Sequence, residues 1–304
     1  MMKLSKSDMM RVGKIAALLL LTEVSCNIQK NENHEIIACG GRRIIIFDEE
    51  QSDGDNLKII WQWNISEASR LPADYQKYLN PLDDCKPVDG SRKVLATSSG
   101  GGVVLIDRES KDILFYANAP MAHSAECLPG DRIVVALSDH PYGNRIELYD
   151  IVNPEKCICH DTLTWGHGVV WISKSERLYA LGSNDLVCYS LMNWDSEQPE
   201  LKREKTWKLP AWGGHDLISI SDNELIVSVA ETVFRFYIDS EKFELFELLD
   251  GEDIKSVNYN KETGKLVYTQ AEIDYWTHHI YSKNPDKTYT IPDVEIYKAR
   301  VYPK

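Results

Sequence analysis

An internal repeat constrains this sequence more than any other feature. Short segments rich in Val, Ile, Tyr and Phe recur along the chain, each bounded by Gly, Asn, Asp or Ser. They group in fours, with a period of about 40–50 residues, which is typical of the blades of a β-propeller. The second segment of each group starts with a charged residue and continues apolar, as in Lys93-Val-Leu-Ala and Arg132-Ile-Val-Val. A two-sheet sandwich would not explain this repeated order of turn and strand.

The two ends of the chain supply a sixth group. Residues 35–64 contain three strand-like segments without a first strand, and residues 297–302 form a lone strand-like segment. Pairing the two removes two open sheet edges at once. We therefore predict an all-β fold, a six-bladed β-propeller of four-stranded blades in which the C-terminal strand completes the N-terminal blade. The predicted blades are 34–64 with 297–302, then 83–119, 122–163, 166–209, 213–249 and 253–292, within one domain spanning 34–304.

Helical pattern is scarce outside one insertion. Residues 66–79 lie between the first two predicted blades and contain Pro72. Because proline interrupts helices, we expect at most two short helical turns there.

The first 26 residues differ from the rest. Lys3, Lys6, Arg11 and Lys14 precede the apolar run 15–21, which is too short to span a bilayer but suits the core of a signal peptide. Val24-Ser-Cys26 then resembles the end of a bacterial lipoprotein signal, although Glu23 departs from it. We predict a signal peptide at 1–25, lipidation of Cys26, a tether at 26–33, and export to the bacterial cell envelope, in the periplasm or on the cell surface. Secretion without lipid and a buried N-terminal helix are the alternatives.

The charge balance excludes one class of partner. The formal net charge is −13, without a basic run, so the chain would repel phosphate backbones and anionic lipid. We expect a monomer that does not bind nucleic acid and that contacts membrane only through its lipid anchor. Cys157 and Cys159 lie on one face of a predicted strand, but no second cysteine pair completes a zinc site.

Three histidines occupy one aligned position in three successive blades. They are His123, His167 and His215, spaced 44 and 48 residues apart, and the same alignment gives Asp83 and Asp253 in the flanking blades. The chain has only 8 histidines, so this coincidence is informative. First strands of blades line the central channel, and these residues should therefore ring one mouth of it.

Other residues should emerge at the same mouth. The loops between second and third strands and the crossovers between blades contribute a set of aromatic and basic side chains: Arg42, Arg43, Tyr142, Arg145, Trp165, Trp212, Tyr275 and Trp276.

Three functional interpretations compete with a structural one. Three imidazoles with a carboxylate could hold a divalent metal such as zinc or manganese, with His123, His167 and His215 as ligands. Without metal, a histidine base, Tyr142 or Tyr275 as acid and Arg145 as a carboxylate clamp would suit β-elimination from an acidic sugar. Ligand binding alone is the third interpretation, with tryptophans stacking on sugar rings. Packed, hydrogen-bonded structural histidines are the fourth.

The sequence resembles known propellers only in outline. The lipoprotein-like start, six degenerate blades and the segments Ala122-His-Ser-Ala-Glu126, Trp165-Gly-His-Gly168 and Gly213-Gly-His-Asp216 resemble uncharacterised six-bladed propeller lipoproteins of gut-type bacteria. That resemblance implies a link to glycan use. The outline is also similar to propeller polysaccharide lyases, including oligogalacturonate lyase, although their catalytic residues cannot be matched here. Gly166-His167 resembles a WD-repeat dipeptide, but the histidines lie too near the turn, and we do not assign the chain to that family.

We therefore expect a propeller mouth that binds a small polar ligand, most simply a carbohydrate or oligosaccharide. A lyase or hydrolase of acidic oligosaccharides and an envelope protein–protein scaffold are the alternatives. The sequence leaves open whether the protein is an enzyme.

Overall fold

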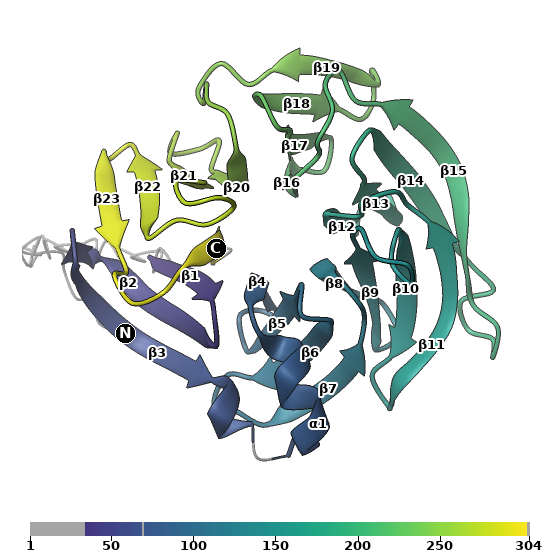
Figure 1. Cartoon of the computed structure of the whole chain (residues 1–304). Helices are drawn as coiled ribbons and strands as arrows, with labels where there is room; N and C mark the ends of the chain where they lie inside the picture. Colours follow the sequence, from purple (N-terminus) through teal and green to yellow (C-terminus); the bar gives the residue numbers. More distant parts are fainter. Residues whose placement is uncertain (1–33, 69, 303–304) are drawn as a thin grey trace, which may run out of the picture. The chain divides into compact units, whose positions relative to one another are not determined.

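The computed structural model describes residues 34–68 and 70–302. These residues form six four-stranded antiparallel sheets arranged as blades around a common axis, with β4, β8, β12, β16 and β20 nearest the centre (Figure 1). The predicted six-bladed propeller is confirmed. The predicted signal peptide, the tether at 26–33 and Cys26 lie outside the described residues.

Each blade runs from an inner strand to an outer strand. The first blade comprises β24 (Ile296–Val301), β1 (Glu35–Gly40), β2 (Arg43–Asp53) and β3 (Asn56–Asn64); the second β4 (Leu82–Val88), β5 (Lys93–Ser98), β6 (Gly102–Asp107) and β7 (Ile113–Asn118); the third β8 (Ala122–Leu128), β9 (Arg132–Leu137), β10 (Arg145–Asp150) and β11 (Asn153–Thr162); the fourth β12 (Gly168–Ile172), β13 (Arg177–Leu181), β14 (Asp185–Met192) and β15 (Glu200–Lys208); the fifth β16 (Asp216–Ser221), β17 (Glu224–Ser228), β18 (Val233–Tyr237) and β19 (Lys242–Leu245); the sixth β20 (Ile254–Tyr259), β21 (Leu266–Gln270), β22 (His279–Lys283) and β23 (Lys287–Thr290).

The hydrophobic core is divided among the interfaces between blades. Six clusters of buried apolar side chains each join two neighbouring blades, such as Val104 of β6 in the second blade with Ile44 of β2 in the first. The middle strands supply most of these side chains because they are covered on both faces, which explains nearly continuous apolar runs such as that of β9. Since the apolar side chains are used between blades, the central axis is left to polar ones.

The first blade closes the ring by joining both ends of the fold. β24 pairs antiparallel with β1, with Ala38 opposite Ala299 and Ile36 opposite Val301. The predicted closure is therefore confirmed. It covers the inner edge of β1, so that β24 faces the axis as the inner strands of the other five blades do.

The insertion after the first blade contains three short helical segments, one more than the sequence suggested. They are η1 (Ile65–Glu67), α1 (Ala73–Gln76) and η2 (Lys77–Leu79), the last two being contiguous. Pro72 stands just before α1 rather than inside it. The segment η2 packs over the turn between β5 and β6, so closely that a Cβ on Gly102 would lie 2.6 Å from the Leu79 side chain. In the described part of the chain, no helix has the length and apolarity to cross a membrane.

A buried charge cluster lies where inner strands meet on the axis. Arg300 of β24 donates from Nε to Asp84 and from Nη1 to Asp216, at 2.9 and 2.8 Å, and Nη2 contacts both carboxylates. Lys298 lies 3.3 Å from Asp216 and donates to the carbonyl of His167 at 3.0 Å. All four charged side chains are buried. The last strand therefore ties the first blade to the second, fourth and fifth blades.

Arg300→Met tests this cluster. Losing the cation leaves Asp84 and Asp216 buried without their main partner, and removing one member of a buried ion pair typically costs about 3–5 kcal/mol. We expect a loss of that size in the free energy of unfolding, measured by urea denaturation. The matched control is Arg92→Met, because Arg92 is exposed and pairs with Asp89 at the surface. It should cost less than about 1 kcal/mol. Equal effects of the two variants would contradict a central role for Arg300.

Candidate functional site

A β-bulge at the start of three inner strands marks the level of the mouth. In β4, β8 and β20 the pairing register shifts by one residue at Asp83, His123 and Lys255. In the other three blades the aligned position is held by His167, His215 and Tyr297. Each of them directly precedes the residue that corresponds to Asp84 of β4. We call these six residues the mouth ring: Asp83, His123, His167, His215, Lys255 and Tyr297.

The sixth blade departs from the sequence alignment. Asp253 was expected in the ring, but the structure places Lys255 there. The reason is the turn after β20, where the Asn260 N–H still donates to the Lys265 carbonyl, so the hairpin extends two residues beyond Asn258. Asp253 instead lies beside the ring, where its Oδ1 accepts a 3.0 Å hydrogen bond from Lys255.

The three histidines lie side by side, as their alignment implied. The ring centroids of His123 and His167 are 4.4 Å apart, and those of His167 and His215 are 5.5 Å apart. Tyr297 packs edge-on against His123 at 5.9 Å. His123 and His167 are only 7% and 8% exposed. The mouth ring is thus a closely packed set of side chains with little solvent contact.

Backbone carbonyls fix the tautomer of two imidazoles. His123 Nδ1 lies 2.9 Å from the Met121 carbonyl, and His167 Nδ1 lies 2.8 Å from that of Trp165. Met121 and Trp165 have positive φ angles of 58° and 50°, a strained conformation that aims each carbonyl at the ring two residues later. A carbonyl can only accept, so Nδ1 carries the proton. Nε2 of each neutral imidazole is therefore a hydrogen-bond acceptor.

His215 has the opposite arrangement. Its Nε2 lies 3.2 Å from the Lys255 ammonium, which can only donate, so Nε2 accepts and Nδ1 carries the hydrogen. That Nδ1 is buried and has no hydrogen-bond partner among residues 34–68 and 70–302. Lys255 also lies 5.6 Å over the ring of Tyr275. The side chain of Lys255 is thus held by an imidazole, a carboxylate and an aromatic face.

The environment keeps all three imidazoles neutral. Burial lowers the pKa of His123 to about 4, and the nearby Lys298 ammonium lowers it further than the Asp84 carboxylate raises it. Burial and the Lys255 ammonium lower the pKa of His215 to about 3. Burial and the two neighbouring imidazoles hold the pKa of His167 well below its usual value. At neutral pH the site therefore presents uncharged rings.

The carboxylates of the site titrate in different directions. Burial raises the pKa of Asp83 to about 7, although its carboxylate accepts hydrogen bonds from the backbone and hydroxyl of Ser99. Burial also acts on Asp84, but Arg300 and Lys298 outweigh it and lower the pKa of Asp84. The ring carboxyl is thus partly protonated near neutrality, whereas the carboxylate beneath it stays ionised.

The metal hypothesis receives no support from this geometry. Within the described ranges, no group of three or more His, Cys, Asp or Glu side chains is placed to hold one ion. Lys255 occupies the Nε2 lone pair of His215, and the ammonium groups of Lys255 and Lys298 would repel a cation. We carry the metal interpretation no further.

The exposed aromatic side chains gather around the mouth. The mouth face, on which the inner strands begin, also carries the turns between second and third strands, as the Ser138 N–H to Met121 carbonyl bond shows. In the described part of the chain, four Phe, Trp or Tyr side chains are exposed, and all are on these connections: Tyr142 (69%), Tyr275 (64%), Trp212 (58%) and Trp165 (38%). Trp276 is half-buried and packs on Tyr297 with centroids 5.5 Å apart.

Two of the three predicted arginines are paired with acidic side chains. Arg43 pairs with Asp293 at 2.8 Å, and Arg145 pairs with the buried Glu147 at 2.5 Å. Arg42 is exposed beside the insertion, where its carbonyl accepts from the Ile65 N–H. Neither Arg43 nor Arg145 presents a wholly uncommitted guanidinium to a ligand.

Several residues of the site escaped the sequence analysis. Lys255 and Tyr297 complete the ring, and Asp84, Asp216, Lys298 and Arg300 support it from below. One signal could have revealed the last two. Lys298 and Arg300 alternate within a segment predicted to be an innermost strand, where charged side chains facing the channel require partners.

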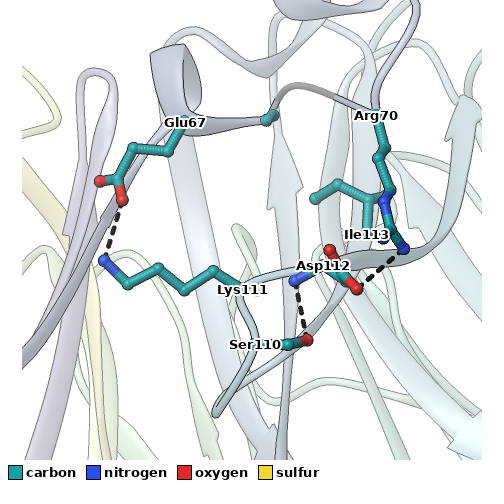
Figure 2. Close-up of a pocket in the computed structure, with 7 residues that line it drawn as sticks. Glu67, Arg70, Ser110, Lys111, Asp112 and Ile113 are labelled. Atoms are coloured by element: carbon teal, nitrogen blue, oxygen red, sulfur yellow. Dashed lines mark hydrogen bonds and ion pairs between the residues drawn. The ribbon is translucent and has the colours of Figure 1, made fainter.

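A separate pocket lies away from the mouth ring. It has a volume of about 210 Å³ and is lined by Glu67, Ala68, Arg70, Ser110, Lys111, Asp112 and Ile113. Figure 2 shows that its charged side chains face one another. Lys111 pairs with Glu67 and Arg70 with Asp112, each at 2.8 Å. Because these charges neutralise each other, the pocket carries no functional hypothesis.

The lowered histidine pKa values predict acid sensitivity. In the unfolded chain His123, His167 and His215 take up three protons as pH falls through about 6.5, whereas in the folded ring their lowered pKa values keep them neutral to lower pH. Stability is therefore present above pH 6.5 and lost on acidification, by about 1.4 kcal/mol per pH unit for each net proton. The raised pKa values of Asp83 and Glu126 act in the opposite sense and offset part of the loss.

Urea unfolding between pH 7.5 and 5 measures this dependence. His123→Gln should make it shallower by roughly one proton. Wild-type stability that does not fall across this range would contradict neutral buried imidazoles.

Comparison with known proteins places the whole propeller in one family. A search of curated proteins found no match. A family model described as a family of unknown function, DUF6528, matches residues 21–302, which include every strand of the fold and the whole mouth ring. The chain therefore belongs to the family of unknown function DUF6528.

Proposed function

We propose that this protein is an exported lipoprotein, anchored through Cys26, whose propeller mouth binds a small polar ligand of the carbohydrate class. The observation that carries the binding proposal is the gathering of all exposed aromatic side chains of the described residues around the mouth ring. Exposed aromatic groups are costly unless they contact something, and flat aromatic faces suit the apolar faces of sugar rings. The export proposal rests on the residues preceding Cys26 alone.

The chemistry of the ring favours binding over catalysis. A general base works best with a pKa near the operating pH, whereas burial lowers the pKa of His123 to about 4. Such an imidazole is neutral but accepts a proton only weakly. Tyr142 and Tyr275 are largely exposed, and within residues 34–68 and 70–302 no hydrogen bond joins either hydroxyl to His123, His167 or His215. The elimination mechanism is therefore not the function we propose.

The aromatic residues give the test. Trp165→Ala and Trp212→Ala should each weaken binding of an oligosaccharide identified on a glycan array by about fivefold to tenfold, corresponding to about 1–1.4 kcal/mol of lost stacking. Titration calorimetry measures the affinities, and an ultraviolet assay for unsaturated products checks for turnover.

Val152→Ala is the control for exposed apolar surface. Val152 is exposed in the turn between β10 and β11, at the opposite end of the blade, and its truncation should not change binding. Binding that survives both tryptophan substitutions would place the site elsewhere, and rapid turnover of the bound glycan would replace the proposal with the lyase alternative.

A further inference from the structure

Two unoccupied acceptor atoms at the mouth indicate what kind of ligand would fit. His123 and His167 each donate from Nδ1 to a carbonyl, which leaves both Nε2 atoms as acceptors. Neither Nε2 has a hydrogen-bond partner among the described residues. Neither is among the fully buried side-chain atoms that lack a partner, so both remain accessible. The two rings are 4.4 Å apart between centroids. A ligand that satisfies both must bring two hydrogen-bond donors to one small area.

The three cationic side chains in or next to the ring already have hydrogen-bond partners within the protein. Arg300 makes its bonds to Asp84 and Asp216, and Lys298 to Asp216 and the His167 carbonyl. Lys255 donates to Asp253 and His215. A ligand carboxylate that displaced a partner of Arg300 or Lys298 would leave a buried charge uncompensated, whereas Lys255, with two of its three N–H groups bonded, retains a donor. A carboxylate would also direct its lone pairs at the lone pairs of Nε2.

Most connections around the mouth are acidic or uncharged, the exceptions being the β1–β2 turn with Arg42 and the insertion with Arg70 and Lys77. From residue 119 to residue 295, none of the connections on the mouth face contains a lysine or an arginine. The two connections of the sixth blade alone contribute six acids: Glu247, Asp250, Glu252, Asp253, Glu272 and Asp274. Approaching anions are repelled by such a field. A cation would be attracted to the rim, but at the imidazoles it would meet the ammonium groups of Lys255 and Lys298.

We infer that the ligand is an uncharged, polyhydroxylated sugar whose hydroxyl groups donate to Nε2 of His123 and His167, and not an acidic sugar. Hydroxyl groups supply closely spaced donors without charge, and the exposed tryptophans supply the apolar faces that a neutral sugar ring can cover. This inference rests on the proposed binding function and narrows its ligand class.

A matched panel of probes tests the class. The purified protein is titrated with neutral, 2-amino and uronic acid oligosaccharides of equal length and linkage, each in gluco, galacto and manno configurations. The tightest ligand should be neutral, and its uronic acid and amino counterparts should bind at least tenfold more weakly. A uronic acid or amino sugar that binds as tightly as its neutral counterpart overturns the inference but leaves carbohydrate binding intact. Failure of every probe overturns both.

Substitutions at the two acceptors test the contacts. His123→Phe and His167→Phe remove the acceptor atoms while keeping a ring, and each should weaken binding of the neutral sugar about tenfold. His123→Gln and His167→Gln restore an oxygen acceptor and should recover part of that loss, which a merely structural role would not produce. His160→Phe, on the outer strand β11, is the control. Unfolding curves establish that each variant is folded, and unchanged affinity in both folded Phe variants overturns the inference.

Discussion

One guanidinium holds the axis of this propeller together. Arg300 from the first blade bridges Asp84 of the second and Asp216 of the fifth, and the last two lie three blades apart in a ring of six. The apolar side chains are used between neighbouring blades, so the axis is stabilised by charge instead. Such pairs add little net stability compared with apolar packing, but they impose a strict geometry on every blade that contributes to them.

The buried charge cluster also contacts the mouth ring. Lys298, two residues before Arg300, bonds the carbonyl of His167 and thereby fixes one imidazole-bearing segment. The same ammonium group helps to lower the pKa of His123. The cluster on the axis thus sets both the position and the protonation state of the rings above it. The result is a site in which neutral imidazoles lie next to paired charges.

The sequence was sufficient for the architecture because blade formation depends on local patterns. Turn residues, short apolar strands and the charged start of each second strand recur from blade to blade, and the missing strand at one end matched the surplus strand at the other. Four members of the mouth ring, Asp83, His123, His167 and His215, also followed from simple alignment, since a similar number of residues separates each from the turn that follows its inner strand.

The rest of the site depends on contacts that no local pattern encodes. Lys255 was missed because its hairpin is longer, which displaced the alignment onto Asp253. The pairing of Arg300 with Asp84 joins residues 216 positions apart and follows only from closure of the ring. The hydrogen-bonding roles of His123 and His215 differ because a carbonyl faces one ring and an ammonium group faces the other. The positive φ angles at Met121 and Trp165 are likewise invisible in their side chains.

The closure by β24 also has a consequence for biosynthesis. Translation produces β1 first among the described strands and β24 last, and β24 brings Tyr297, Lys298 and Arg300 with it. While the nascent chain is still emerging from the ribosome, five blades can assemble, but Asp84 and Asp216 have no counter-ion and the mouth lacks one of its six walls. A complete mouth ring therefore exists only in chains whose synthesis has passed β24, so that prematurely terminated products would lack both part of the ring and the counter-ions of Asp84 and Asp216.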